Sequence, residues 1–106
     1  MKHGFVICIA ALAMLSVFVV HAADDQTGAE GKSSLCAACH GVAGISDSPL
    51  VPNLAGQKEE YLVKALRDYR TGKRQEPIMM SIAQDLGDDD IAELAAYFAR
   101  LKPPGE

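Results

Sequence analysis

The apolar residues of this chain recur at the spacing of helices rather than at the alternation of strands. In Gln57–Arg70, apolar side chains stand at i, i+3, i+4 and i+7, and Lys and Glu occupy the opposite face. A second stripe runs through Asp88–Lys102, with Gly87 as N-cap, an Asp-rich first turn that suits the helix dipole, and Pro103 as a stop. We therefore predict two helices that bury the stripes Leu62, Ala65, Leu66, Tyr69 and Ile91, Leu94, Phe98, Leu101.

The remaining segments complete an all-helical prediction. Ala29–Ala38 is expected to form the first helix, with Leu35 facing inward. Gly41–Gly56 is rich in Gly, Pro, Ser and Asn and is therefore predicted to be a loop. Gln75–Asp85 contains Pro77 and shows little periodicity, so we predict irregular structure there. No segment alternates convincingly as a strand would, and the predicted fold class is all-α.

Residues 1–22 have the three parts of a secretory signal. Lys2 supplies a positive end, Gly4–Val20 is a 17-residue run without charge, and Val20-His21-Ala22 is a cleavage site with small residues. We predict cleavage after Ala22, which leaves residues 23–106 as one domain in the periplasm. The alternative is a retained anchor, because the run reaches the lower limit of the ~17–25 residues that span a bilayer.

Cleavage simplifies the chemistry that remains. The 84-residue product keeps one His, two Cys and two Met, namely His40, Cys36, Cys39, Met79 and Met80. This product has a single His and no Ser–His pairing, so it offers few of the residues that a triad hydrolase needs. Nine Lys or Arg against fourteen Asp or Glu give a net charge near −5, which disfavours nucleic acid and anionic membranes as partners. This charge would suit a protein partner with a basic docking patch, and salt would weaken the attraction.

Cys36-Ala37-Ala38-Cys39-His40 is the attachment signature of a c-type haem. On one helical turn, thiols at i and i+3 share a face, so both sulfurs can reach the vinyl groups on one porphyrin edge while the imidazole binds iron. Two alternatives use the same residues. A dithiol redox motif normally accompanies a βαβ pattern, which this sequence lacks. A zinc site needs four ligands, and the sequence has no second Cys or His cluster.

The order of these features resembles that of a small bacterial class I c-type cytochrome, similar to one half of the di-haem periplasmic forms. The resemblance covers nearly all of residues 23–106. It rests on Cys36-Ala37-Ala38-Cys39-His40-Gly41, on Val51-Pro52-Asn53-Leu54-Ala55-Gly56-Gln57 before Tyr61-Leu62, on Met79 with Ile82-Ala83, and on Asp88-Asp89-Asp90-Ile91 before Leu94-Ala95-Ala96-Tyr97-Phe98. Gly87 departs from the pattern, because the similar proteins tend to have Ser or Thr at this cap.

The resemblance implies one covalent haem c whose iron is bound by His40 and a methionine. In the family pattern a proline follows the ligand His by twelve positions, which is Pro52, and its carbonyl would accept the proton of the other ring nitrogen. The pattern favours Met79 over Met80, because Met79 precedes Leu86 by seven positions and an Ile-Ala pair follows it at three and four. It also implies that the N- and C-terminal helices cross, and that a middle helix and loops enclose the haem.

An iron with all six positions filled does not readily bind oxygen or peroxide, so the resemblance implies electron transfer rather than catalysis. We therefore expect the protein to be a soluble, monomeric electron carrier of the periplasm, with redox proteins as donor and acceptor. After processing it is not expected to be inserted in the membrane. One alternative is a haem-bearing subunit of a periplasmic dehydrogenase or oxidase complex. The other is a haem enzyme or ligand sensor, which would need an open iron site.

Overall fold

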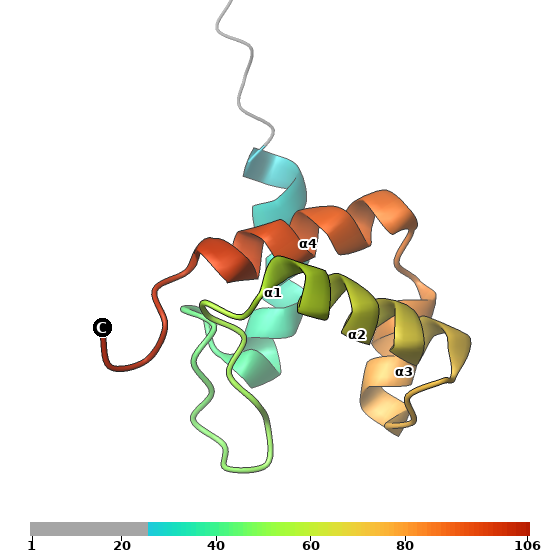
Figure 1. Cartoon of the computed structure of the whole chain (residues 1–106), viewed down its shortest axis with the longest axis horizontal. Coiled ribbons are helices and arrows are strands. Elements are labelled where there is room, and N and C mark those ends of the chain that lie inside the picture. The colour runs from blue at the N-terminus through green and yellow to red at the C-terminus, as the bar shows by residue number, and fades with distance from the viewer. Residues whose placement is uncertain (1–25) are drawn as a thin grey trace, which may run out of the picture.

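This computed structural model describes residues 26–106, which contain four helices joined by loops. In sequence order they are α1 (Gln26–His40), α2 (Glu59–Thr71), α3 (Pro77–Gln84) and α4 (Asp88–Arg100) (Figure 1). No strand occurs among these residues, so the all-α prediction is confirmed. The predicted signal segment, residues 1–22, lies outside them. None of these four helices is long and apolar enough to cross a membrane.

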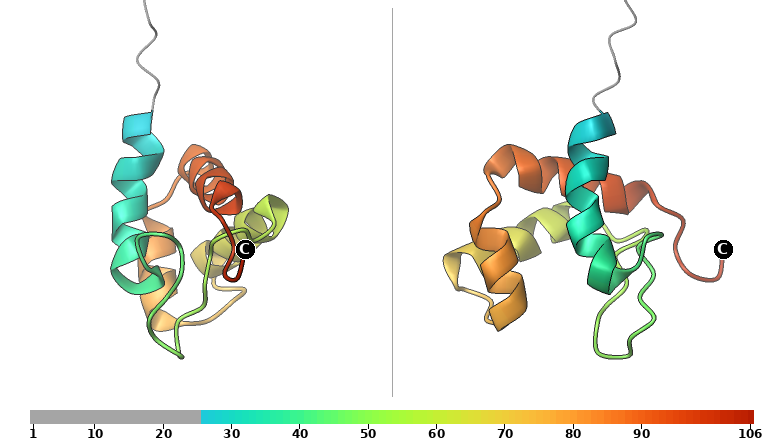
Figure 2. Two further views of the ribbon diagram at one scale, coloured as in Figure 1. Left: turned by 90° about the vertical axis from the view of Figure 1, so that its left-hand side faces the viewer. Right: turned by 180° about the vertical axis from the view of Figure 1, so that it is seen from behind.

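The other helices are assembled around α4. It packs against both α1 and α2, and α2 also packs against α3. Figure 2 shows α1 crossing α4 at a steep angle, with α2 on the other side of α4. The predicted crossing of the N- and C-terminal helices is therefore confirmed, and α2 is the middle helix.

The core lies where the apolar stripes of α2 and α4 meet. Leu62 of α2 packs with Leu94, Ala95 and Phe98 of α4 in one buried cluster. The Phe98 ring lies nearly perpendicular to that of Tyr97, with 5.1 Å between the ring centroids. Such edge-to-face pairs add some stability beyond the area they bury. On the predicted α4 stripe, Ile91, Leu94 and Phe98 are confirmed as core, and Leu101, which follows the helix, is half-buried. On the α2 stripe only Leu62 is buried.

The helix boundaries differ from the predicted ones by a few residues. α1 begins earlier than Ala29–Ala38 and continues through the haem motif to His40. α2 begins at Glu59 because Lys58 has an extended backbone. α4 ends at Arg100 rather than Lys102, and Leu101 is extended. A residue that precedes proline avoids the helical conformation, so Lys102, which precedes Pro103, could not belong to the helix as predicted.

The prediction of irregular structure over Gln75–Asp85 is wrong, because most of this stretch is α3. The helix starts with Pro77 in its first turn, where the missing proline N–H would have no intrahelical partner anyway. The Glu76 side chain accepts a hydrogen bond from the Met79 N–H, with 2.7 Å between nitrogen and oxygen. A Glu-Pro pair at a helix start was thus the local signal for α3, although Glu is an uncommon N-cap.

The prediction that Leu35 faces inward is also wrong, since its side chain is 59% exposed. α1 instead buries Ser33 and packs Cys36 against the core cluster. These two residues are three positions apart and share a helix face. Neighbouring residues on a helix point about 100° apart, so Leu35 lies off the face that contains Cys36.

Candidate functional site

The haem motif occupies the last turns of α1, which continues two residues beyond the predicted helix end at Ala38. Cys36 and Cys39 are three positions apart on this helix, and both thiols are free. Cys36 packs against the core cluster, and this burial raises the pKa of its thiol. Cys39 is exposed, beside a shallow hollow between the end of α1 and the following loop, lined also by Asp47 and Val51. One thiol therefore faces the protein interior and the other faces its surface.

His40 is the last residue of α1, and its orientation is set by a loop carbonyl. The residue is only 7% exposed, and its Nδ1 lies 2.7 Å from the carbonyl oxygen of Pro52. Because a carbonyl can only accept, Nδ1 must carry the proton and donate it. The neutral ring then has its lone pair on Nε2, which is the nitrogen left free to bind a metal. The predicted pairing of His40 with Pro52 is present as a contact.

The loop that carries Pro52 is held in place by three hydrogen bonds. The Gly44 carbonyl accepts from the N–H groups of Leu54 and Ala55, at 2.8 and 2.9 Å. The Asn53 Oδ1 accepts from the Ser46 N–H at 2.7 Å. Gly44 has a φ of 71°, and a Cβ there would come within 2.9 Å of the Ala55 nitrogen. Only glycine fits this close crossing, which fixes the chain on either side of Pro52.

The loop is also joined to the core at its far end. The N–H of Gly56 donates to the carbonyl of Phe98 near the end of α4, at 3.0 Å. Ala55 is 6% exposed, and Leu54 packs against the core cluster. The Pro52 carbonyl is thus positioned between two fixed points, the Gly44 crossing and the contact with α4.

The two methionines lie next to each other on α3, and both are half-buried. Met79 shares a helix face with Ile82 and with Ala83, which is fully buried. Met80 lies about 100° further round the helix. A Cβ placed on Gly72 would stand 3.9 Å from the Met80 Cε, so the Met80 methyl group lies against the turn between α2 and α3.

The predicted ligands come from two helices that do not pack on each other. In the described part of the chain α1 packs on α4 and α3 packs on α2, with no contact between α1 and α3. Figures 1 and 2 show the end of α1 and α3 on either side of the lower part of the molecule. The donor set suits a c-type haem: two thiols on one turn, an imidazole with a free Nε2 and a thioether from a separate element.

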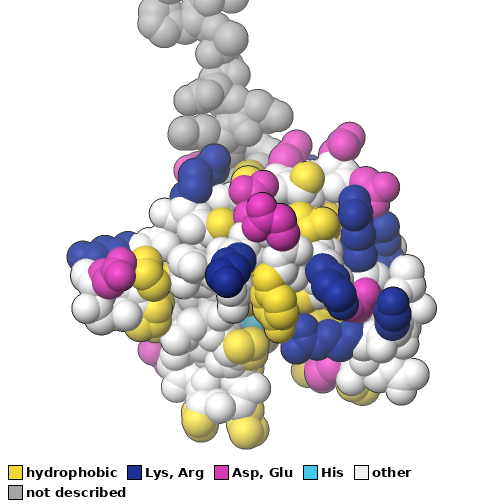
Figure 3. All heavy atoms as spheres, in the orientation of Figure 1, with side chains coloured by type: hydrophobic (Ala, Val, Ile, Leu, Met, Phe, Trp, Pro, Cys, Tyr) yellow, Lys and Arg dark blue, Asp and Glu magenta, His cyan; other side chains and the backbone are white. Residues whose placement is uncertain are grey.

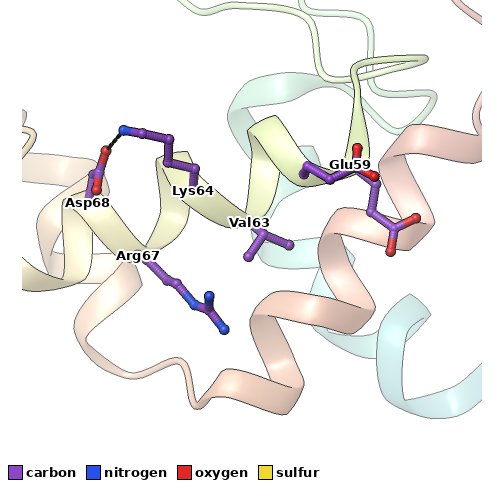
Figure 4. A pocket seen from close by; sticks show the side chains of 6 residues that line it. Glu59, Val63, Lys64, Arg67 and Asp68 are labelled. Atoms are coloured by element: carbon purple, nitrogen blue, oxygen red, sulfur yellow. Dashed lines mark hydrogen bonds and ion pairs between the residues drawn. The ribbon is translucent and has the colours of Figure 1, made fainter.

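A second hollow lies elsewhere, on the outer side of α2, and includes none of these residues. It is lined by Glu59, Glu60, Val63, Lys64, Arg67 and Asp68, and Figure 4 shows it from close by. Its lining is mostly charged and it is open to solvent. Sequence reasoning did not single out this side of α2.

Comparison with known proteins finds one matching family and several similar chains. The family description "Cytochrome c" matches residues 26–102. Cytochrome c4 of Pseudomonas aeruginosa is 44% identical over 84 residues, covering 79% of this chain and 42% of that protein. Cytochrome c-554(548) of Halomonas halodenitrificans is 41% identical over 80 residues, covering 73% of this chain and 96% of that protein.

A solved structure shares the fold. Thiosulfate dehydrogenase from Marichromatium purpuratum superposes with a TM-score of 0.64 at 35% identity, covering 73% of this chain and 18% of that one. The chain therefore spans less than half the length of the Pseudomonas relative and a small part of the dehydrogenase.

Proposed function

Since this chain belongs to the cytochrome c family, which implies a covalently attached haem c with its iron, we propose that it is an electron carrier with one such haem. The single observation that carries the proposal is the end of α1. There the attachment motif is helical, and His40 is held by the Pro52 carbonyl with its Nε2 left free.

Each residue of the proposed site has a separate role. Cys36 and Cys39 would form the two thioether bonds to the haem. His40 and Met79 would bind its iron, and Met80 would not. Pro52 keeps the proton on Nδ1, which fixes the ring orientation and makes His40 a more basic ligand. The position of the Met80 methyl group at the α2–α3 turn supports the choice of Met79.

Iron held between imidazole and thioether supplies one-electron chemistry at a raised potential. The chain contributes a fixed environment, because the loop around Pro52 is hydrogen-bonded at both ends and His40 is buried. Ligands that stay in place leave no position for a substrate on the iron. This is why we favour transfer over catalysis.

The location and partners belong to the same proposal. Residues 1–22 would direct export and be removed, so the carrier would work in the periplasm as a monomer. Its donor and acceptor would be redox proteins, and its negative net charge would suit one with a basic docking patch. The alternative, a haem-bearing subunit of a periplasmic dehydrogenase or oxidase complex, is supported by the likeness to thiosulfate dehydrogenase.

The test uses protein isolated from the periplasm after expression beside a working haem-attachment system. We expect a processed chain that stains for haem on a denaturing gel and titrates as a single one-electron couple. Carbon monoxide added to the reduced protein should leave its spectrum unchanged. A processed chain without covalent haem would contradict the proposal, and a spectrum altered by carbon monoxide would favour the enzyme or sensor. Constant comigration with one dehydrogenase would favour the subunit.

A further inference from the structure

Although the chain as a whole is acidic, many of its cations are concentrated in one place. Residues 64–74 hold five Lys or Arg and a single Asp, a net charge of +4. The other described residues hold four Lys or Arg and eleven Asp or Glu, a net charge of −7. The basic face, as we call it, consists of Lys64, Arg67, Arg70, Lys73 and Arg74. Figure 3 shows Lys and Arg side chains gathered over α2 and the turn that follows it.

Helix geometry keeps these cations together. Lys64, Arg67 and Arg70 follow one another at intervals of three along α2, so neighbours in this series share a face. The helix ends at Gly72, whose φ of 77° turns the chain back and whose N–H donates to the Tyr69 carbonyl. The Arg74 N–H then donates to the Asp68 carbonyl at 3.0 Å. Lys73 and Arg74 therefore stay beside the end of α2.

Two carboxylates neutralise only part of this charge. Asp68 pairs with Lys64, as Figure 4 shows. Asp88 accepts a hydrogen bond from the Arg70 guanidinium, with 2.6 Å between Nη2 and Oδ1, and lies 3.9 Å from Arg67 Nε. The hydrogen bond from Lys64 holds the pKa of Asp68 below its usual range, and the one from Arg70 does the same for Asp88. Both carboxylates are consequently ionised at neutral pH.

Lys73 and Arg74 are the cations of the basic face that have no ion-pair partner in the described part of the chain, although both lie near enough to Asp68 to help lower its pKa. Both residues are exposed, and neither forms an ion pair within residues 26–106. The Arg74 guanidinium lies over the Tyr69 ring, 4.8 Å from its centroid, and its Nη1 is 3.4 Å from the Tyr61 hydroxyl. These contacts orient Arg74 without neutralising it. Oriented arginine beside tyrosine is typical of the residues that carry protein–protein binding.

The basic face adjoins the helix that carries the methionines. α2 packs against α3, and the Met80 methyl group lies at Gly72, directly before Lys73 and Arg74 in the chain. A protein docked on this face would therefore sit close to α3. Short distances between a docked partner and the redox centre are what electron transfer requires.

We propose that the basic face is the docking site for the acidic surface of a redox protein partner. The inference rests on the proposed function, because it names the partner chemistry for the same electron carrier. A carrier has a donor and an acceptor, and the negative remainder of the molecule remains available for a partner of the opposite charge. The two partners would then approach different sides.

The test compares two holoprotein variants that each lose one Lys and one Arg. Lys73→Gln/Arg74→Gln removes the two cations of the basic face that form no ion pair within residues 26–106. Arg100→Gln/Lys102→Gln, the matched control, removes the same charge at the far end of α4 (Figure 1). The reduced proteins are oxidised by ferricyanide, an anion, or by tris(phenanthroline)cobalt(III), a cation. In each reaction one electron passes from ferrous haem to the oxidant, giving ferric haem and the reduced complex.

At low ionic strength we expect the first variant to react with ferricyanide at least about threefold more slowly than the parent, because local positive charge steers anions. Its reaction with the cobalt complex should not slow. The control variant should differ from the parent by less than about twofold with either oxidant, and the difference between variants should shrink in high salt. Equal effects of the two substitution pairs on the ferricyanide rate, or no effect of the first, would overturn the proposal.

A second measurement asks whether the face binds an acidic polypeptide. Poly-L-glutamate added to the isotope-labelled holoprotein should shift the backbone amide resonances of residues 64–74 first, and the first variant should lose these shifts. Shifts centred elsewhere, or kept in the first variant, would contradict the assignment. Failure of the proposed function looks different, because a chain without covalent haem would react with neither oxidant.

Discussion

At His40, one hydrogen bond decides which ring nitrogen carries the proton. Nδ1 is committed to the Pro52 carbonyl, and that carbonyl is placed by backbone contacts at Gly44 and by the Asn53 side chain. A residue in an exposed loop thus controls the state of a buried ring twelve positions away. Loop variants should therefore change the proposed iron site without touching a ligand.

Asn53→Ala tests this control. The substitution removes the acceptor of the Ser46 N–H, which should cost about 0.5–1.5 kcal/mol of stability. A looser Pro52 carbonyl would weaken the bond to Nδ1 and make His40 a less basic ligand, so we expect a higher reduction potential and shifted His40 ring resonances. Val42→Ala, at a residue that is 85% exposed in the same loop, is the control. An unchanged potential in Asn53→Ala would mean that Pro52 is only a turn residue.

The choice between Met79 and Met80 is tested by replacing each with Ala. We expect Met79→Ala to lose the weak sulfur-to-ferric-iron charge-transfer band and Met80→Ala to keep it, because the Met80 methyl group is already packed at Gly72. Met80→Ala should cost less than the roughly 2–5 kcal/mol typical of a fully buried methionine, since Met80 is half-buried. The reverse pattern would place the ligand one residue later. A band that survives each single change would show that either methionine can bind the iron, and a band absent from the parent would exclude methionine ligation.

Among the helices, the crossing of α1 and α4 is reinforced by charge. Lys32 on α1 pairs with Asp90 on α4, and its Nζ also lies 3.3 Å from Glu93 Oε2. Asp90 has a second role, because its Oδ2 accepts the Gly87 N–H at 2.9 Å and so caps the start of α4. A glycine N-cap that lacks a side chain is thereby supported from inside the helix. Lys32 and then the Gly87 N–H lower the pKa of Asp90 below its ordinary value of 3.8.

This lowered pKa predicts how Asp90 links stability to pH. A carboxyl whose pKa is lower in the folded state adds stability above its unfolded pKa, and this contribution is lost as pH falls through the folded value. Asp90→Asn should therefore be less stable than the parent at pH 7, and the difference should shrink below about pH 4. Urea unfolding of the parent and variant holoproteins at pH 7 and at pH 3 measures this difference in stability.

Asp89→Asn is the matched control for the Asp90 experiment, because Asp89 is exposed and forms no ion pair within residues 26–106. It should leave the pH dependence nearly unchanged. A stability gap between Asp90→Asn and the parent that stays constant from pH 7 to pH 3 would show that the Lys32 and Gly87 contacts contribute little.

For the molecule as a whole, size limits what the protein can bury on its own. The buried cluster of the described chain contains one side chain from α2 and three from α4, and α1 and α3 do not pack on each other. A domain of this length is marginally stable without a cofactor, a metal or disulfides. Covalent haem would supply apolar surface to both α1 and α3. Folding and haem attachment should therefore be coupled.

Cys36→Ala/Cys39→Ala tests this coupling in protein matured beside a haem-attachment system. We expect no haem stain on a denaturing gel, and a lower helical signal in the far-ultraviolet circular dichroism than the parent shows. Ala38→Ser, at an exposed position between the two thiols, should keep both the stain and the signal. A variant without covalent haem but with full helicity and cooperative unfolding would show that the four helices need no cofactor to fold.

Local features were readable from the sequence because their causes are local. The haem motif depends on residues within one turn, and the α4 stripe of Ile91, Leu94 and Phe98 needs only helical spacing to predict its burial. Gly87 is the N-cap of α4, as predicted. The observed helix ends differ from the predicted ones by a few residues. The spacing of apolar residues locates a helix but does not fix its ends, which depend on capping and proline residues.

Tertiary structure decided the features that depend on distant contacts. A helix as short as α3 is marginal alone and is stabilised by packing on α2, so periodicity did not reveal it. Leu35 is exposed because α4 selects the face of α1 that contains Cys36, a choice that α1 cannot make in isolation. The contact between His40 Nδ1 and the Pro52 carbonyl depends on where a loop returns, and the family pattern suggested it before geometry did. The total charge and the run of five cations in residues 64–74 are readable from the sequence. Only the fold decides which carboxylates lie beside them, because Asp88 at the start of α4 reaches Arg70 across the packing of α2 on α4.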